Sequence, residues 1–340
     1  MNSADLVSDP AELTVLYRGP LSSCNYGCGY CPFAKRVETP EDRAADAAAL
    51  ARLMDWVANV GERRIVRVFF TPWGEALHHA RYRQAIVELS RMPHVRQVAV
   101  QTNLAGSVAW LARADVAAVA IWATYHPSQV RRERFLARSA AVQDLGVAHS
   151  VGVVGARNAI EEIAAMRAQL PPEIPMWVNA FSMRGGAVDP GYYTAADIAR
   201  LHAVDPLFEV GLAPLVTAGR SCRTGESVIS VDGAGGVRRC HFDHRVLGNL
   251  WRDELDSILA ARPCRRPTCD CHIGYVHLSD LRAERVYGEG LLARIPLASQ
   301  RAPEQAQLLL ARARLLQSPA APSGVTTAEL SAEAPAHPTR

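Results

Sequence analysis

Three cysteines in one short loop constrain this chain more than any other feature of its sequence. Cys24, Cys28 and Cys31 lie within eight residues and directly follow an apolar stretch. We expect Gly27 and Gly29 to let this loop bend tightly, so that the three sulfurs face one centre. Three thiolates can ligate three irons of a four-iron cluster and leave the fourth iron open. An open position on a redox metal is a place for substrate chemistry.

Composition predicts a folded protein without nucleic-acid or membrane partners. The chain has 340 residues, of which 49% are hydrophobic, enough for one large α/β domain and a smaller appendage. Its net charge is +3, and Lys35 is the only lysine among 37 basic residues, which indicates genomic composition bias. The first residues lack the pattern of a secretion signal, and the most apolar run, residues 116–124, is too short to span a membrane. We expect a cytoplasmic protein whose eight cysteines stay reduced and favour metal ligation over disulfides.

Strand and helix patterns alternate along the N-terminal part of the chain. Helical periodicity separates apolar, β-branched segments, most clearly over residues 40–60, which begin at a proline and end before a glycine. The predicted strands cover residues 12–17, 64–70, 95–101, 115–124, 147–154 and 176–181. Such alternation is typical of right-handed βαβ units in a parallel sheet. The sequence therefore predicts an α/β fold, a partial (β/α)6 TIM-like barrel.

Unusual residue clusters follow the carboxyl ends of the predicted strands. The cysteine loop follows the first strand, Trp73-Gly74-Glu75 follows the second, Thr102-Asn103 follows the third and Tyr125-His126 follows the fourth. In β/α barrels the loops at this face form the active site. We therefore expect the active site at the carboxyl ends of the predicted strands.

Three further residues are speculative candidates for catalysis: His126, Tyr125 and Arg184. His126 could act as an acid or base because its ordinary pKa is close to neutral. The alternative is a histidine that is simply hydrogen-bonded in the barrel mouth.

The loop Cys-x3-Cys-x2-Cys, with Tyr30 before the third cysteine, resembles the signature of the radical S-adenosylmethionine (radical SAM) superfamily. Trp73-Gly74-Glu75 resembles the Gly-Gly-Glu element of that superfamily, with Trp73 in place of the first glycine. The resemblance covers roughly residues 12 to 215. It implies that Cys24, Cys28 and Cys31 ligate a [4Fe–4S] cluster with an open iron site. It also implies a SAM-binding set formed by Tyr30, Gly74, Glu75, Asn103, Thr124, Val154 and Gly155.

The resemblance implies a specific reaction. The open iron chelates SAM, and one electron breaks a sulfur–carbon bond to give methionine and a 5′-deoxyadenosyl radical, which abstracts hydrogen from a substrate. The electron would come from a donor such as a flavodoxin or ferredoxin. One alternative is a structural zinc site, which His78 or His126 would complete. Another is a non-catalytic metal-binding or electron-transfer protein on the same scaffold.

A second group of cysteines flanks a predicted hairpin of residues 227–231 and 236–239, with one cysteine before it and four after it. The group comprises Cys222, Cys240, Cys264, Cys269 and Cys271. A hairpin brings its two ends together, so Cys222 and Cys240 are the surer ligands. With the predicted helix at residues 253–261, the pattern resembles the SPASM and twitch extensions. It implies one auxiliary [4Fe–4S] cluster on four of the five cysteines, with a structural zinc as the alternative. Such extensions often accompany enzymes that modify peptides, and others act on small molecules.

The sequence divides into five predicted parts. These are an N-terminal arm (1–11), the partial barrel (12–215), a small cysteine-rich hairpin and helix domain (216–280), a helical segment (281–316) and a disordered tail (317–340).

Overall fold

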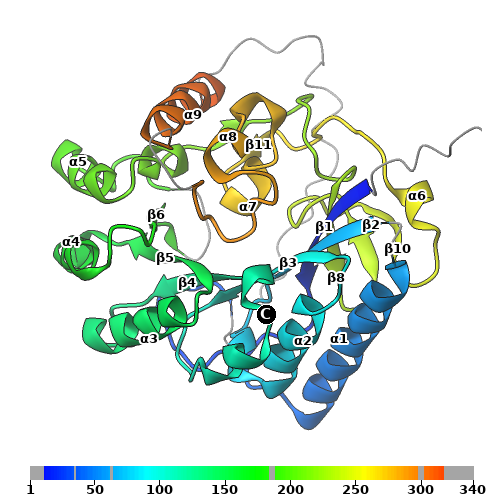
Figure 1. Ribbon diagram of the computed structural model, residues 1–340. Helices are drawn as coiled ribbons and strands as arrows, with labels where there is room; N and C mark the ends of the chain where they lie inside the picture. The colour runs from blue at the N-terminus through cyan, green and yellow to red at the C-terminus, as the bar shows by residue number, and fades with distance from the viewer. Residues whose placement is uncertain (1–10, 34–35, 62–63, 184–187, 298–301, 318–340) are drawn as a thin grey trace, which may run out of the picture.

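A curved nine-stranded sheet organises the molecule. The structure is a computed structural model that describes residues 11–33, 36–61, 64–183, 188–297 and 302–317. The strand order is β10-β9-β8-β1-β2-β3-β4-β5-β6. Helices α1 to α5 surround the convex side of this sheet, and short C-terminal elements lie on its concave side (Figure 1). The predictions for residues 1–10 of the N-terminal arm, for residues 318–340 of the tail and for Arg184 lie outside the described residues.

All six predicted strands are present and pair in parallel in chain order. Their bounds are Ala11–Arg18 (β1), Arg64–Phe70 (β2), Val95–Thr102 (β3), Val119–Tyr125 (β4), Ala148–Gly155 (β5) and Met176–Ala180 (β6). The fourth strand begins later than predicted, because Asp115 accepts a hydrogen bond from the amide of Ala117 and starts a 3₁₀ turn. The predicted α/β class and partial barrel are confirmed.

The outer helices follow the strands as predicted, except between β3 and β4. Their bounds are Pro40–Val60 (α1), Ala80–Ser90 (α2), Arg132–Asp144 (α3), Ile160–Gln169 (α4) and Ala195–Val204 (α5). Helix α1 starts at a capping box formed by Thr39 and Asp42 and ends at Gly61, whose φ is 63°. Two 3₁₀ turns, Ala109–Arg113 and Val116–Ala118, replace a helix between β3 and β4.

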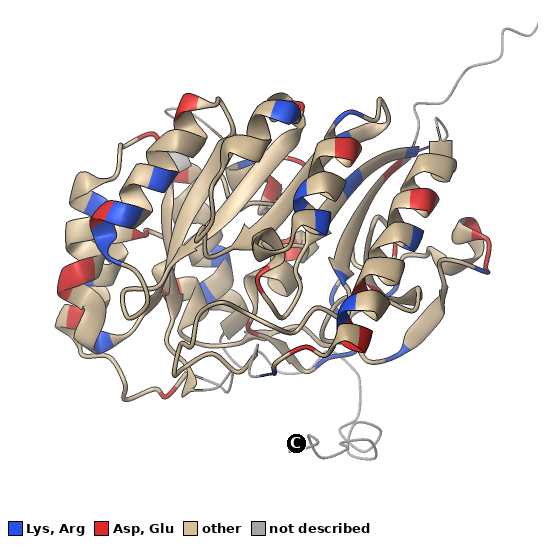
Figure 2. Ribbon diagram, turned by 90° about the horizontal axis from the view of Figure 1, so that it is seen from below, with Lys and Arg blue, Asp and Glu red and all other residues tan. Residues whose placement is uncertain are grey.

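Alternate residues of each strand face the helices or the inside of the barrel. In β2, Val68 and Phe70 pack in the large cluster beneath the helices, whereas Phe69 packs with Trp122 in an inner cluster. Acidic and basic residues are interspersed along the outer helices (Figure 2). Among the described residues, no helix is both long and apolar enough to cross a membrane.

The predicted C-terminal hairpin is present, and it extends the barrel sheet. Strands β8 (Val228–Asp232) and β9 (Gly236–Arg238) are antiparallel, and β8 pairs in parallel with β1. Strand β10 (Val246–Asn249) adds to β9. The helix predicted over residues 253–261 is only one turn, α6 (Leu255–Ile258), because Glu254 and Leu259 on either side have extended backbones.

The chain after residue 260 fills the concave side. It contains β11 (Thr268–Cys269), which pairs with β7 (Leu215–Val216), then α7 (His272–Tyr275) and α8 (Glu284–Tyr287). Ile273, Leu292 and Ala293 complete the inner cluster. The helix predicted near residues 303–316 is α9 (Ala302–Gln317), which packs on a separate apolar cluster. How these parts divide into domains stays a prediction.

We predict that Asp46→Ala destabilises the fold strongly. The fully buried Asp46 carboxylate of α1 accepts hydrogen bonds from the amide of Leu21 (3.1 Å), the hydroxyl of Tyr82 (2.8 Å) and Nε of Arg81 (2.7 Å). Its removal leaves these donors without their acceptor, and we expect a loss of about 3–5 kcal/mol in the free energy of unfolding. Urea unfolding measures this loss. The exposed Asp55→Ala on the same helix is the control, and an equal loss in both variants would contradict the prediction.

Candidate active site

The cysteine loop lies at the carboxyl end of β1 and contacts the ends of β3 and β4. Sγ of Cys24 accepts hydrogen bonds from the amide of Tyr26 (3.4 Å) and from Nδ2 of Asn103 (3.6 Å). Sγ of the buried Cys28 lies 3.4 Å from Nδ1 of His126. The loop therefore sits at the face where the sequence predicts the site.

The donor set of this loop fits an iron–sulfur cluster. Burial raises the pKa of Cys24 to about 11, and the charges of Glu75, Cys28 and Cys31 add to the rise. Three nearby thiolates need a positive partner, which the irons of a cluster supply. Among the described residues, no three Cys, His, Asp or Glu side chains lie where they could hold a single metal ion. The thiolates of a four-iron cluster bind different irons, so they need not converge on one ion.

Gly74 is the glycine that the loop geometry requires. A Cβ at this position would lie 2.1 Å from the carbonyl oxygen and 2.9 Å from the amide nitrogen of Ser23. A Cβ at Gly27 or Gly29 would meet nothing within 4 Å, and neither backbone is left-handed. The expectation that Gly27 and Gly29 are needed for a tight bend is therefore wrong. The tight approach is instead between the end of β2 and the residue before Cys24.

Glu75 joins the ends of β2 and β3. Its buried carboxylate accepts hydrogen bonds from the amide of Leu77 (3.0 Å), the hydroxyl of Thr102 (2.6 Å) and the amide of Asn103 (2.6 Å). Burial raises its pKa, and these three hydrogen bonds oppose the rise. The amide of Glu75 also donates to the carbonyl of Ser23 at 2.9 Å. The side chain thus has local partners on both oxygens, and its contact with SAM stays a prediction.

Four other residues of the predicted SAM-binding set lie around the barrel mouth. Nδ2 of Asn103 donates to Oδ1 of Asn25 at 2.9 Å, in addition to its contact with Cys24. Thr124 and Val154 are half-buried and share the inner face with Trp122 and Ser150 of their own strands. The hydroxyl of Tyr30 lies 2.7 Å from Nδ1 of His126.

Gly155, the last residue of that set, ends β5 next to a tyrosine. Its carbonyl accepts a hydrogen bond from the Tyr193 hydroxyl at 2.6 Å. A Cβ here would lie 2.9 Å from Val178, so this strand end also packs closely.

The speculative catalytic residues lie in different environments. Tyr125 is buried between the sheet and α3, where its hydroxyl donates to Glu162 at 2.7 Å, so it faces the helices and not the inner face. His126 lies in the mouth between Tyr26 and Tyr30, and burial lowers its pKa to about 4. It is therefore neutral at physiological pH.

No protein-family model and no curated protein matches this chain. The solved structure of anSMEcpe with bound AdoMet and the Kp18Cys peptide is similar over 89% of this chain and 97% of that chain, with 11% identity and a TM-score of 0.50. The chain has a radical SAM fold. The fold that the cysteine loop implied is thereby confirmed.

Two further solved structures are similar over less of the chain. Streptococcus suis SuiB bound to S-adenosylmethionine has 17% identity and a TM-score of 0.47 over 73% of this chain, and BtrN in complex with AdoMet and 2-DOIA has 16% identity and a TM-score of 0.36 over 73%. The chain spans 65% of the SuiB chain and 85% of the BtrN chain.

Within this radical SAM fold, four cysteines of the second group lie close enough for the charge of one to shift the pKa of a neighbour. Burial raises the pKa of Cys240, and the charge of Cys222 adds to the rise. Burial also raises the pKa of Cys269, with further contributions from Cys271 and Cys240. Cys264 is the fifth member, and its backbone amide donates to the carbonyl of Arg220 at 2.8 Å.

Arg18 and His241 are two inner residues that the sequence reasoning missed. Nε of Arg18 donates to the carbonyl of Thr71 at 2.9 Å. The negative charge of a Cys271 thiolate favours the positively charged form of the Arg18 side chain. Nε2 of His241 lies 2.8 Å from Oγ1 of Thr71, and its Nδ1 lies 2.6 Å from Oγ of Ser230. Both residues join the barrel mouth to the second cysteine group. In the sequence, Arg18 directly follows a predicted strand and His241 directly follows Cys240. These positions are the only sequence signals that could have indicated the two residues.

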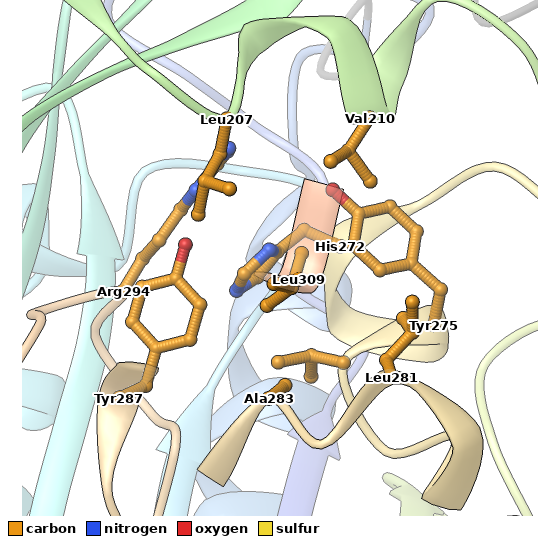
Figure 3. A pocket seen from close by; sticks show the side chains of 10 residues that line it. Leu207, Val210, His272, Tyr275, Leu281, Ala283, Tyr287, Arg294 and Leu309 are labelled. Atoms are coloured by element: carbon orange, nitrogen blue, oxygen red, sulfur yellow. The ribbon is translucent and has the colours of Figure 1, made fainter. Parts of the chain in front are cut away.

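A small cavity lies behind the second cysteine group, lined by His272, Tyr275, Tyr287 and Arg294 among others (Figure 3). Its volume is about 10 Å³, enough for roughly one water molecule and too small for a substrate. Arg294 donates to Oδ1 of Asn179 at 3.1 Å and stacks on Trp177. This side chain therefore anchors the C-terminal segment inside the radical SAM fold.

Proposed function

We propose that this protein is a radical SAM enzyme that cleaves S-adenosylmethionine reductively and abstracts hydrogen from a peptide or small-molecule substrate. The observation that carries the proposal is the three-cysteine loop held at the carboxyl ends of the parallel strands. When bound on Cys24, Cys28 and Cys31, a [4Fe–4S] cluster with an open iron supplies the electron that breaks the sulfur–carbon bond of SAM. The anSMEcpe structure, which shares this fold, contains AdoMet.

The residues around the loop fix its position. Gly74 and Glu75 connect the end of β2 to Ser23, and Asn103 donates to both Cys24 and Asn25. These contacts would orient the three thiolates that hold the cluster. The aromatic ring of Tyr30 lies between His126 and Phe181 and gives the mouth an apolar wall, which would exclude water from a bound SAM molecule.

We propose a peptide as the first substrate class to test. The anSMEcpe structure contains a peptide, Kp18Cys. Beside the cysteine loop of the present chain, Phe33 and Trp73 are 45% and 51% exposed and stack at 5.8 Å between ring centroids. An exposed aromatic pair at the rim of a site suits an apolar side chain of a peptide. Small molecules are the second substrate class of this proposal.

We propose that the second cysteine group holds an auxiliary [4Fe–4S] cluster. The charges of these cysteines act pairwise, Cys222 on Cys240 and both Cys240 and Cys271 on Cys269, which supports a cluster whose four irons are bound by different thiolates. Zinc is the alternative metal for four cysteines. An auxiliary cluster here would lie next to Arg18 and His241, on the inner side of the barrel mouth.

Anaerobic reconstitution tests the proposed function. We expect about eight iron and about eight sulfide ions per chain, because two four-iron clusters need that many. With dithionite and SAM, the holoenzyme is expected to form 5′-deoxyadenosine and methionine, both measured by liquid chromatography. Absence of both products would contradict the catalytic role. About four iron ions and one zinc ion per chain would instead assign zinc to the second group.

A further inference from the structure

A basic pocket lies beside the cysteine loop. Its volume is about 310 Å³, and its wall includes Asn25 and Tyr26, which stand between Cys24 and Cys28. Most of the other lining residues belong to α3 or directly precede it. The amide of Gly27 donates to Oε1 of Gln129 at 2.9 Å, so the loop rests directly on this wall.

Three arginines line the pocket: Arg131, Arg134 and Arg138. They are three and four residues apart, so they share one face of α3 and its first turn. Within the described part of the chain, none of them forms an ion pair with a carboxylate, whereas their neighbour Arg132 pairs with Glu162.

The polar groups that face these arginines are neutral. Arg138 forms a hydrogen bond with the Tyr26 side chain, and the positive charge of Arg134 opposes the rise that burial causes in the pKa of Tyr26. Of the described residues, no aspartate or glutamate lines the pocket. Glu133, the acidic residue in the first turn of α3, is not among the lining residues. The pocket thus gathers three positive charges without internal compensation, which favours an anionic partner.

We infer that this pocket is the docking site of an acidic electron-donor protein. The inference rests on the proposed function, which needs one electron delivered to the cysteine loop for each cleavage of SAM. We place SAM and substrate at the inner face of the barrel mouth, whereas this pocket is lined by the cysteine loop together with residues of the outer helix α3. The donor is oxidised by one electron, the cluster is reduced by one electron, and no atom is transferred between the proteins.

The decisive variant is Arg131→Glu/Arg134→Glu, which leaves Arg138 and its bond to Tyr26 in place. Both substituted residues are exposed, and acidic residues are favourable near the start of a helix, so the fold is expected to persist. We expect the Kd of the reconstituted holoenzyme for an acidic flavodoxin, measured by isothermal titration calorimetry at low salt, to rise at least about tenfold. Salt is expected to weaken wild-type binding and to have little effect on the variant.

A control with the same change in charge is Arg52→Glu/Arg91→Glu. Both residues are exposed: Arg52 lies on α1, and Arg91 directly follows α2 at the opposite end of the sheet from the cysteine loop. We expect its Kd to change by less than about twofold. Equal rises in both double variants, or no rise in either, would overturn the inference. Arg134→Lys, which keeps the charge, is expected to bind the flavodoxin as the wild type does.

Two more measurements separate this inference from the proposed function. With dithionite, a small-molecule reductant that needs no docking site, the pocket variant is expected to cleave SAM at the wild-type rate. If the wild type itself yields no 5′-deoxyadenosine with dithionite, the proposed function fails, whatever the binding result. If inorganic phosphate binds the wild type and not the variant while flavodoxin binds both equally, the pocket is a small-anion site and the docking inference is overturned.

Discussion

The Cys28→Ala variant is expected to form 5′-deoxyadenosine no faster than a solution without enzyme. Cys28 is the most buried of the three thiols in the loop, and no other cysteine lies in this loop to replace it. Without this thiolate a four-iron cluster keeps only two protein ligands, and we expect about four iron ions per chain to be lost after reconstitution. Liquid chromatography of the products and an iron assay measure both effects.

Ser23→Ala is the matched control for this loss. Ser23 belongs to the same loop, and it contacts Gly74 and Glu75 through its backbone alone. Its variant is expected to keep both the iron and the activity. Circular dichroism at several temperatures shows whether each variant is folded. SAM cleavage by a folded Cys28→Ala protein at the wild-type rate would disprove the assignment of the loop as the cluster site.

Gly74→Ala is expected to cause the second largest loss, because it forces β2 away from the cysteine loop. The added methyl group would lie 2.1 Å and 2.9 Å from the backbone oxygen and nitrogen of Ser23, and a backbone cannot rotate aside as a side chain can. The hydrogen bond from the Glu75 amide to Ser23 would be stretched as well. We expect a loss of about 1–3 kcal/mol in the free energy of unfolding, as for other overpacked sites. Iron retention and SAM cleavage are expected to fall with it.

Gly106→Ala separates this clash from the general effect of losing a glycine. Gly106 is exposed in the loop after β3, and a Cβ there would meet nothing within 4 Å. Urea unfolding and iron content are expected to be unchanged in this variant. If Gly74→Ala were as stable and as rich in iron as Gly106→Ala, the close approach of β2 to Ser23 would not be what positions the loop.

Local patterns in the sequence predicted most of the barrel. Apolar strands such as residues 64–70 and the capped helix at residues 40–60 carry their own signals in neighbouring residues, and both have the predicted bounds. The predicted start of β4 and the predicted length of α6 were less accurate. A side-chain cap at Asp115 starts a turn before β4, and α6 is only a single turn. The site face was predictable for the same reason as the strands, since each cluster follows a strand end.

Contacts between distant segments were not predictable from local patterns. The requirement for glycine at Gly74 arises from Ser23, which lies on another loop, whereas Gly27 and Gly29 look equally constrained in the sequence. The buried partners of Glu75 belong to β3, so its side-chain direction follows from the sheet and not from its own motif. Arg18 and His241 meet through Thr71, and no spacing in the sequence brings these three together.

The pairing of β8 with β1 makes the cysteine-rich segment part of the sheet that carries the first loop. If the chain ended after β6, β1 would become an edge strand, with unpaired amide and carbonyl groups open to other chains. The hairpin therefore protects that edge as well as presenting Cys240. A lineage without the proposed auxiliary cluster would still need a strand in this place, so its cysteines could disappear while the hairpin remained.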